Sequence, residues 1–122
     1  MTVLFVVLGG GLGAPLRYAT DRAVQARTGG AFPWGTLVVN VAGSFLLGLV
    51  TALLGAGGPE WLRFAVGVGF CGALTTYSTF GYETVRLAQS GSWSSAAGNV
   101  VLSLAAGLGA AAAGLALGGA LA

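Results

Sequence analysis

The sequence predicts an all-α membrane protein with four transmembrane helices in a single domain, residues 1–122. The first observation behind this prediction is composition: 56% of the residues are hydrophobic and only 7% are charged, whereas a soluble domain carries about 25% charged residues. A soluble helical bundle would need a polar exterior that this composition cannot supply. The second observation is the spacing of the charges, which leaves four uncharged runs: residues 1–16, 28–59, 64–82 and 87–122.

A helix crosses the hydrocarbon core in roughly 20 residues, so the uncharged runs locate helices at about residues 3–26, 33–55, 61–88 and 94–120. In the first helix, Gly9 and Gly13 are small residues four apart, which lets another helix approach closely. Arg17 lies further along this helix, and two interpretations of it stay open. Its side chain either extends to the lipid headgroups or attracts an anion at the mouth of a pore.

The second helix begins near Trp34, a residue type that suits the membrane interface. Four small or polar residues then recur every four positions and share one face: Thr36, Asn40, Ser44 and Gly48. Lipid offers no hydrogen-bond partner, so this face is expected against protein or water. The Asn40 side chain either bonds a neighbouring helix or donates its NH₂ group to a desolvated anion.

The third helix carries three glycines between residues 67 and 72 and an unbroken run of hydroxyl groups from Thr75 to Thr79. Each glycine weakens a helix by roughly 1 kcal/mol relative to alanine, and hydroxyls compete with the helical hydrogen bonds. We therefore expect a break near the middle of the span. Carbonyls freed there are ligands for a cation, and the N-terminus of the following half-helix favours an anion. Tyr77 and Phe80 share a face of that half, either for ordinary packing or to line a passage.

The fourth helix shows Asn99, Ser103 and Gly107 at spacings of four, followed by Gly114 and Gly118. The first two make a further polar stripe, and the last two indicate a close-packing surface. Neutral donors thus occur in three helices, with no acid or base at mid-span. This pattern favours a narrow passage or a buried interface, and it argues against a proton-coupled pump.

The charged residues bear on orientation and on function. An even number of helices brings both termini to one side, and the other side holds Arg22, Arg27 and Arg86. The positive-inside rule places that other side in the cytoplasm, but so few charges leave insertion in both orientations open. A net charge of +2 without clustered basic residues argues against nucleic-acid binding. With no histidine, one cysteine and three carboxylates near helix ends, an enzyme is not expected.

Three stretches carry a family resemblance: GAPLRY at residues 13–18, Gly35-Thr36 with Asn40 and Gly43-Ser44-Phe45, and GFCGALTTYSTF at residues 69–80. They resemble the Fluc (CrcB) family of microbial fluoride channels, over nearly the whole chain. The resemblance implies an antiparallel, dual-topology homodimer in the cell membrane, with two fluoride pores. It also implies passive export of fluoride from the cytoplasm.

The resemblance further implies a structural sodium ion at the dimer centre, which is not transported and is held by the backbone carbonyls of Gly72 and Thr75. The fluoride pore would have Arg17 at its mouth. The residues expected to line the pore are Asn40, Tyr77, Ser78, Thr79, Phe80, Asn99 and Ser103.

Three positions depart from the family pattern: Tyr77 replaces the usual phenylalanine, Asn99 a common tyrosine, and Gly107 a serine. Tyrosine keeps an electropositive ring edge that can face a small anion, so we expect permeation to survive, and Asn99 supplies an amide donor. Stripping water from fluoride is costly unless donors replace it, and conduction needs weak binding at several sites.

Two alternative functions explain less. Small multidrug exporters also have four helices, but they depend on a membrane-embedded glutamate in the first helix, and residues 1–16 contain no acid. A non-transporting assembly subunit held together by its glycine surfaces would leave the polarity of Asn40 and of residues 75–79 unexplained.

Overall fold

The computed structural model describes residues 1–121. Every regular element in that range is helical, and the bounds in chain order are α1 Thr2–Thr28, α2 Trp34–Gly55, α3 Glu60–Leu62, the π-helix η1 Arg63–Cys71, α4 Gly72–Leu74, α5 Ser78–Gln89 and α6 Trp93–Leu121. Three of these helices, α1, α2 and α6, are long and apolar enough to cross a membrane. The all-helical fold expected from the sequence is therefore confirmed.

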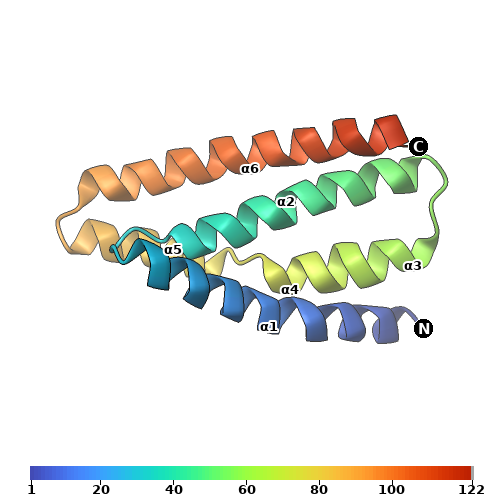
Figure 1. The fold of residues 1–122 in the computed structure, drawn as a ribbon, viewed down its shortest axis with the longest axis horizontal. Coiled ribbons are helices and arrows are strands. Elements are labelled where there is room, and N and C mark those ends of the chain that lie inside the picture. Colours follow the sequence, from blue (N-terminus) through green and yellow to red (C-terminus); the bar gives the residue numbers. More distant parts are fainter. Residues whose placement is uncertain (122) are drawn as a thin grey trace.

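The helices form an elongated antiparallel bundle (Figure 1). Both termini and the α2–α3 connection lie at one end of the bundle, and the α1–α2 and α5–α6 connections lie at the other end. The short helices α3 and α4 and the π-helix between them lead into α5 along one line. These pieces together make the third pass, so the chain runs the length of the bundle four times.

The third pass is a composite rather than one continuous helix. Helical structure runs without a gap from Glu60 to Leu74, stops for residues 75–77 and resumes at Ser78. Residues Arg63–Cys71 form nine residues of π-helix. The sequence did not predict this segment, since its glycines and hydroxyls indicated only a break in the third helix. Such segments are rare in proteins, and those that do occur are often found at functional sites.

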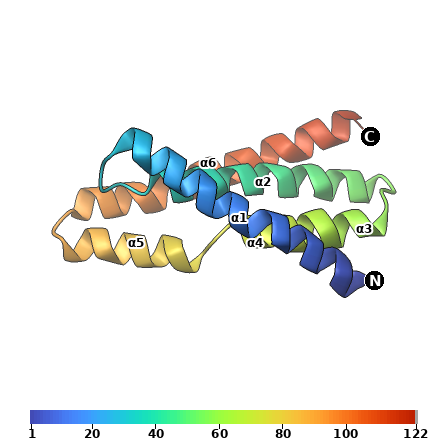
Figure 2. The same cartoon turned by 60° about the horizontal axis from the view of Figure 1, so that its bottom comes forward.

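Glycines allow the closest helix contacts. Helix α2 packs along α6, and α1 crosses over η1 and α4 (Figure 2). A Cβ atom added to Gly9 or Gly13 would collide with backbone atoms of η1, which confirms the close approach expected from this pair. A Cβ atom added to Gly48 or Gly114 would collide with backbone atoms across the α2–α6 contact. The glycine surface of the fourth helix therefore packs against the second.

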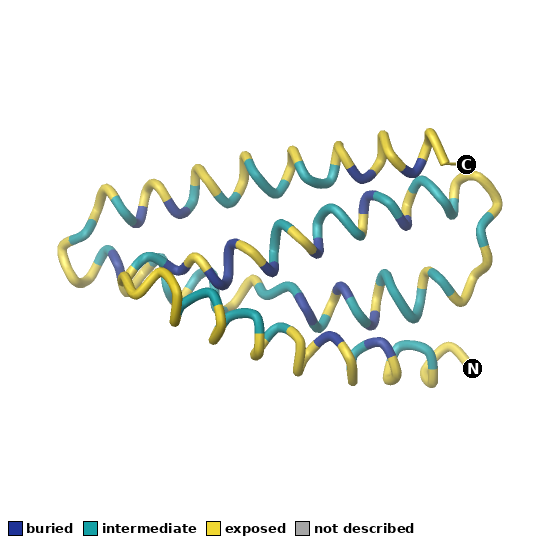
Figure 3. The backbone as a smooth tube through the Cα atoms, viewed as in Figure 1, coloured by how far each residue is buried: buried dark blue, intermediate teal, exposed yellow. Residues whose placement is uncertain are grey.

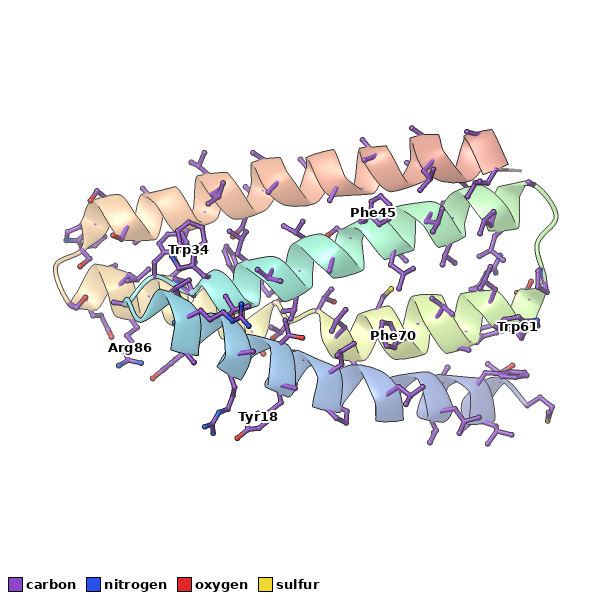
Figure 4. The ribbon with its side chains drawn as sticks, in the orientation of Figure 1. Tyr18, Trp34, Phe45, Trp61, Phe70 and Arg86 are labelled. Atoms are coloured by element: carbon purple, nitrogen blue, oxygen red, sulfur yellow. The ribbon has the colours of Figure 1, made fainter. Side chains whose placement is uncertain are left out.

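Much of the outer surface of the bundle is apolar. Exposed residues follow the outer sides of α1 and α6 (Figure 3), and they include Leu12 at 70% and Leu108 at 71% exposure. Trp34 at the start of α2 and Trp61 in α3 lie toward opposite ends of the bundle (Figure 4). Tryptophans gather at the two membrane interfaces, so this arrangement suits a multi-pass membrane protein.

Candidate functional site

The interruption between α4 and α5 is held open by side chains that take amide hydrogens away from the helix. In an α-helix the Thr76 N–H would donate to the Gly72 carbonyl, but it donates to Asn40 Oδ1 at 2.8 Å. The Thr79 N–H would likewise donate to the Thr75 carbonyl, but it donates to Thr76 Oγ1 at 3.2 Å. The carbonyls of Gly72 and Thr75 therefore lose their helical donors.

Asn40 reaches the interrupted segment from α2. Its Oδ1 accepts from the Thr76 N–H, and its Nδ2 donates to the Thr76 carbonyl at 3.1 Å. The side-chain amide thus pairs with Thr76 as a residue of a neighbouring β-strand would. Nδ2 carries two hydrogens, and this pairing uses one of them. Asn40 therefore bonds the interrupted segment of the third pass, and one of its amide hydrogens is left for another acceptor.

A cavity of about 380 Å³ lies beside the interruption. We call it the first cavity, and its walls come from α2, η1, α4, α5, α6 and the interrupted segment. It brings together six of the residues predicted from the sequence: Asn40, Gly72, Thr75, Tyr77, Phe80 and Ser103. The ring centroids of Tyr77 and Phe80 are 6.2 Å apart with an interplanar angle of 49°, so the two rings contribute one aromatic wall.

A second cavity, of about 190 Å³, lies between α1, α2 and the start of α5. It brings together Arg17 and Thr79 from the predicted residues, and its walls also include Asp21, Thr36 and Thr76. The guanidinium group of Arg17 and the carboxylate of Asp21 are thus part of one lining. Thr76 belongs to the walls of both cavities, so this residue lies between them.

The two carbonyls without helical donors, those of Gly72 and Thr75, belong to residues that line the first cavity. Gly43 on α2 allows the segment to lie this close, because a Cβ atom there would collide with the Thr75 methyl group. Carbonyls of unwound helices are ligands for sodium, so the residues present fit such an ion. The described residues, 1–121, contain no group of three or more His, Cys, Asp or Glu side chains placed to hold a metal ion.

Two predicted residues line neither cavity. Ser78 is exposed at the start of α5. Asn99 is only 1% exposed, and it lies between α5 and α6. Its Nδ2 donates to Thr84 Oγ1 at 2.8 Å, and its Oδ1 accepts from Ser103 Oγ at 3.4 Å. A hydrogen bond with Ser103 therefore links Asn99 to the cavity lining.

Two contacts involve residues that were not among the predicted site residues. Thr36 Oγ1 donates to Glu83 Oε1 at 2.6 Å and so ties α2 to α5. Asp21 Oδ1 is buried without a hydrogen-bond partner in the described chain, 1–121. It lies against Gly35, where a Cβ atom would collide with this carboxylate oxygen.

Sequence reasoning also missed the central place of Thr76. A signal for it was present, because the polar face of α2 must find polar partners in other helices. The hydroxyl run at residues 75–79 and the carboxylate of Glu83 are the polar groups of the third pass closest in sequence to the expected break. The sequence indicates that they meet the α2 face, but not which group meets which.

Comparison with known proteins identifies the family. Residues 4–115 match the family described as "CrcB-like protein, Camphor Resistance (CrcB)". The chain belongs to the CrcB family. The family assignment expected from the sequence motifs is therefore confirmed over most of the chain.

This CrcB-family chain has relatives that are similar along most of its length. A protein of Nocardia farcinica named "Fluoride-specific ion channel FluC 1" is 56% identical over 110 residues, covering 90% of this chain and 75% of the relative. A protein of the same name from Frankia casuarinae is 55% identical over 123 residues, covering 96% and 95%. Another, from Streptomyces avermitilis, is 53% identical over 116 residues, covering 94% of each. These are names of channels and not of enzymes, in agreement with the class expected from the sequence.

Proposed function

We propose that this chain is a fluoride channel. The observation that carries the proposal is the pair of cavities on either side of Thr76, because their walls combine neutral donors with an aromatic pair. The names of the relatives, which are fluoride-specific ion channels, support the same function. The walls of the first cavity contain no positively charged side chain. An anion would therefore bind there weakly enough to leave again.

The proposed path runs from Arg17 in the second cavity, past Thr76, to the aromatic pair in the first. Dehydrating fluoride is costly unless donors replace the lost water. The remaining Asn40 hydrogen, the hydroxyls of Thr79 and Ser103 and the ring edges are the donors proposed to do this. Each is weak, and weak binding at several sites in series favours conduction.

Transport is proposed to be passive and directed outward by the fluoride gradient. The side chains that line the first cavity include no carboxylate, histidine, lysine or arginine, which are the groups that commonly couple transport to protons. Fluoride that enters a cell as HF ionises in the cytoplasm and accumulates there. A passive channel in the cell membrane would let it leave down that gradient and lower its cytoplasmic concentration.

The working assembly is proposed to be an antiparallel homodimer with two pores. Tyr77 is 86% exposed in the single chain, so the first cavity opens toward the outside of the bundle. Polar groups at this depth do not face lipid without partners. A second copy of the chain covering this opening would bury them and complete the walls of the cavity.

A structural sodium ion is proposed at the centre of this dimer. The carbonyls of Gly72 and Thr75, which lack helical donors, would hold it together with the same groups of the second copy. Bound there, the ion would neutralise oxygen dipoles that otherwise face one another at the interface. It would therefore act on assembly and not as cargo.

The channel proposal is tested with purified protein in liposomes loaded with fluoride. Efflux is followed with a fluoride electrode, and matched liposomes loaded with chloride measure selectivity. We expect fluoride efflux well above that of protein-free liposomes, with chloride efflux close to background. An absence of fluoride efflux, or chloride flux of equal size, would overturn the proposal. Accessibility of tags on both termini tests whether insertion occurs in both orientations.

A further inference from the structure

We propose that Asn99 and Thr84 direct the hydroxyl hydrogen of Ser103 and thereby keep it available to fluoride. This inference rests on the proposed function, and it assigns positioning roles to two residues that line neither cavity. Asn99 is 1% exposed, so water does not compete for its hydrogen bonds.

Three hydrogen bonds connect the two walls of the first cavity. Ser103 Oγ donates to Asn99 Oδ1 at 3.4 Å, and Asn99 Nδ2 donates to Thr84 Oγ1 at 2.8 Å. Thr84 Oγ1 in turn donates to the Phe80 carbonyl at 2.8 Å. Ser103 and Phe80 both line the cavity, so the chain of bonds begins on one lining residue and ends on another.

The direction of each donor follows from the last bond. A backbone carbonyl only accepts, so Thr84 must spend its single hydrogen on Phe80. The Thr84 oxygen can then only accept from Asn99, which fixes the NH₂ group of the amide toward Thr84. The amide oxygen therefore faces Ser103, and Ser103 must be the donor. The backbone of α5 thus determines where a hydroxyl of α6 points.

Ser103 differs in this respect from the hydroxyls of four threonines. The hydroxyls of Thr28, Thr51, Thr75 and Thr84 donate to the carbonyl four residues earlier at distances of 3.0, 2.8, 2.8 and 2.8 Å. Ser103 donates instead to a side chain four residues earlier, at 3.4 Å. Good O–H···O bonds measure about 2.5–3.0 Å. The Ser103 hydrogen is therefore held loosely beside the cavity.

A loosely held hydrogen can turn to an anion at little cost. Without the Asn99 oxygen, we expect Ser103 to adopt the bond that the four threonines make and to donate to the carbonyl of residue 99. That shorter bond would compete with fluoride for the same hydrogen. Asn99 thus keeps the Ser103 hydroxyl from donating to a backbone carbonyl of α6.

The test compares Asn99→Leu with wild type in fluoride-loaded liposomes over a range of fluoride concentrations. We expect the half-saturating fluoride concentration to rise about tenfold, the size of losing about one hydrogen bond to an ion, with a smaller change in maximal flux. Thr84→Val should shift it in the same direction, and Thr84→Ser, which retains the hydroxyl, should restore it. Thr51→Val is the matched control, because Thr51 makes the same backbone bond without a partner on another helix.

A double substitution separates positioning from general support of the fold. In the Ser103→Ala background, Asn99→Leu should cause no further change in the half-saturating concentration. An additional shift of the same size in that background would overturn the inference, because Asn99 would then act without Ser103. If Asn99→Leu does not fold, the inference is tested with Thr84→Val and Thr84→Ser. Equal half-saturating fluoride concentrations for these two variants would also overturn the inference.

The two proposals fail in distinguishable ways. Fluoride efflux by wild type together with unchanged half-saturation in Asn99→Leu and Thr84→Val would overturn the positioning roles alone. An absence of fluoride efflux by wild type would overturn the channel function and this inference together.

Discussion

Asn40 pairs with the backbone of Thr76 through both halves of its side-chain amide, accepting from the N–H at 2.8 Å and donating to the carbonyl at 3.1 Å. One side chain of α2 thereby satisfies both polar groups of a residue that has left the helical ladder. Buried backbone groups need such partners, above all in a membrane. The same amide lines the first cavity, so its structural role and its proposed contact with an ion belong to one residue.

Asn40→Asp is expected to reduce fluoride flux to background. Aspartate keeps an acceptor for the Thr76 N–H, but it loses the donor for the carbonyl and places a negative charge on the proposed anion path. Gln89→Glu, which makes the same amide-to-acid change at an exposed position at the end of α5, is the control. Efflux from liposomes measures both, and wild-type flux in Asn40→Asp would remove Asn40 from the pore.

Phe80→Ile is expected to stop fluoride flux while leaving the dimer intact. Isoleucine is apolar but has no electropositive ring edge to face an anion. Phe5→Ile, at a half-buried position of α1 that lines neither cavity, is the control. Size-exclusion chromatography checks assembly and efflux checks function, and a wild-type rate would refute the ring-edge argument.

Removing sodium is expected to lower the thermal stability of the assembly. A ligand that binds only the folded state stabilises it in proportion to the logarithm of its concentration. Unfolding temperatures in detergent, measured as sodium is replaced by a large organic cation at constant ionic strength, test this. Potassium at the same concentration is the control for ionic strength. Identical unfolding temperatures throughout would argue against a site at Gly72 and Thr75.

Gly114→Val is expected to destabilise the protein by about 1–3 kcal/mol, the range for overpacking a close contact. Its side chain would collide with the backbone of α2. Gly109→Val, on the same helix but with no atom within 4 Å of an added Cβ, should change stability much less. Denaturant or thermal unfolding of both variants measures the difference, and equal losses would contradict this account of the α2–α6 contact.

The fold class could be predicted from the sequence because it depends on the hydrophobicity and charge of many residues taken together. Low charge and long apolar runs are enough to predict helices in a membrane, since only helices and closed barrels satisfy the backbone there. The polar face of α2 could be predicted as well, because helical periodicity sets which residues share a side. Thr36 and Asn40 both hydrogen-bond to the third pass, as a polar face in a membrane requires.

The finer arrangement could not be predicted, for reasons that differ between residues. The π-helix at Arg63–Cys71 packs against α1 and α2, and no local sequence pattern distinguishes it from an ordinary α-helix. Asn99 belongs to a polar stripe with Ser103, but the stripe does not reveal that Asn99 turns toward Thr84. The functional roles given to Arg17, Asn40 and the aromatic pair stay predictions, since placing a residue beside a cavity does not establish what passes through it.

The hydrogen bonds of Thr76 determine which of its polar groups is left for a further partner. Asn40 engages its N–H and its carbonyl, and its hydroxyl oxygen already accepts from the Thr79 N–H. The hydroxyl hydrogen of Thr76 takes part in none of these bonds, and within residues 1–121 it has no recorded acceptor. Thr76, which lines both cavities, therefore has one donor still to offer, and a hydrogen-bond donor is a partner for an anion rather than for a cation.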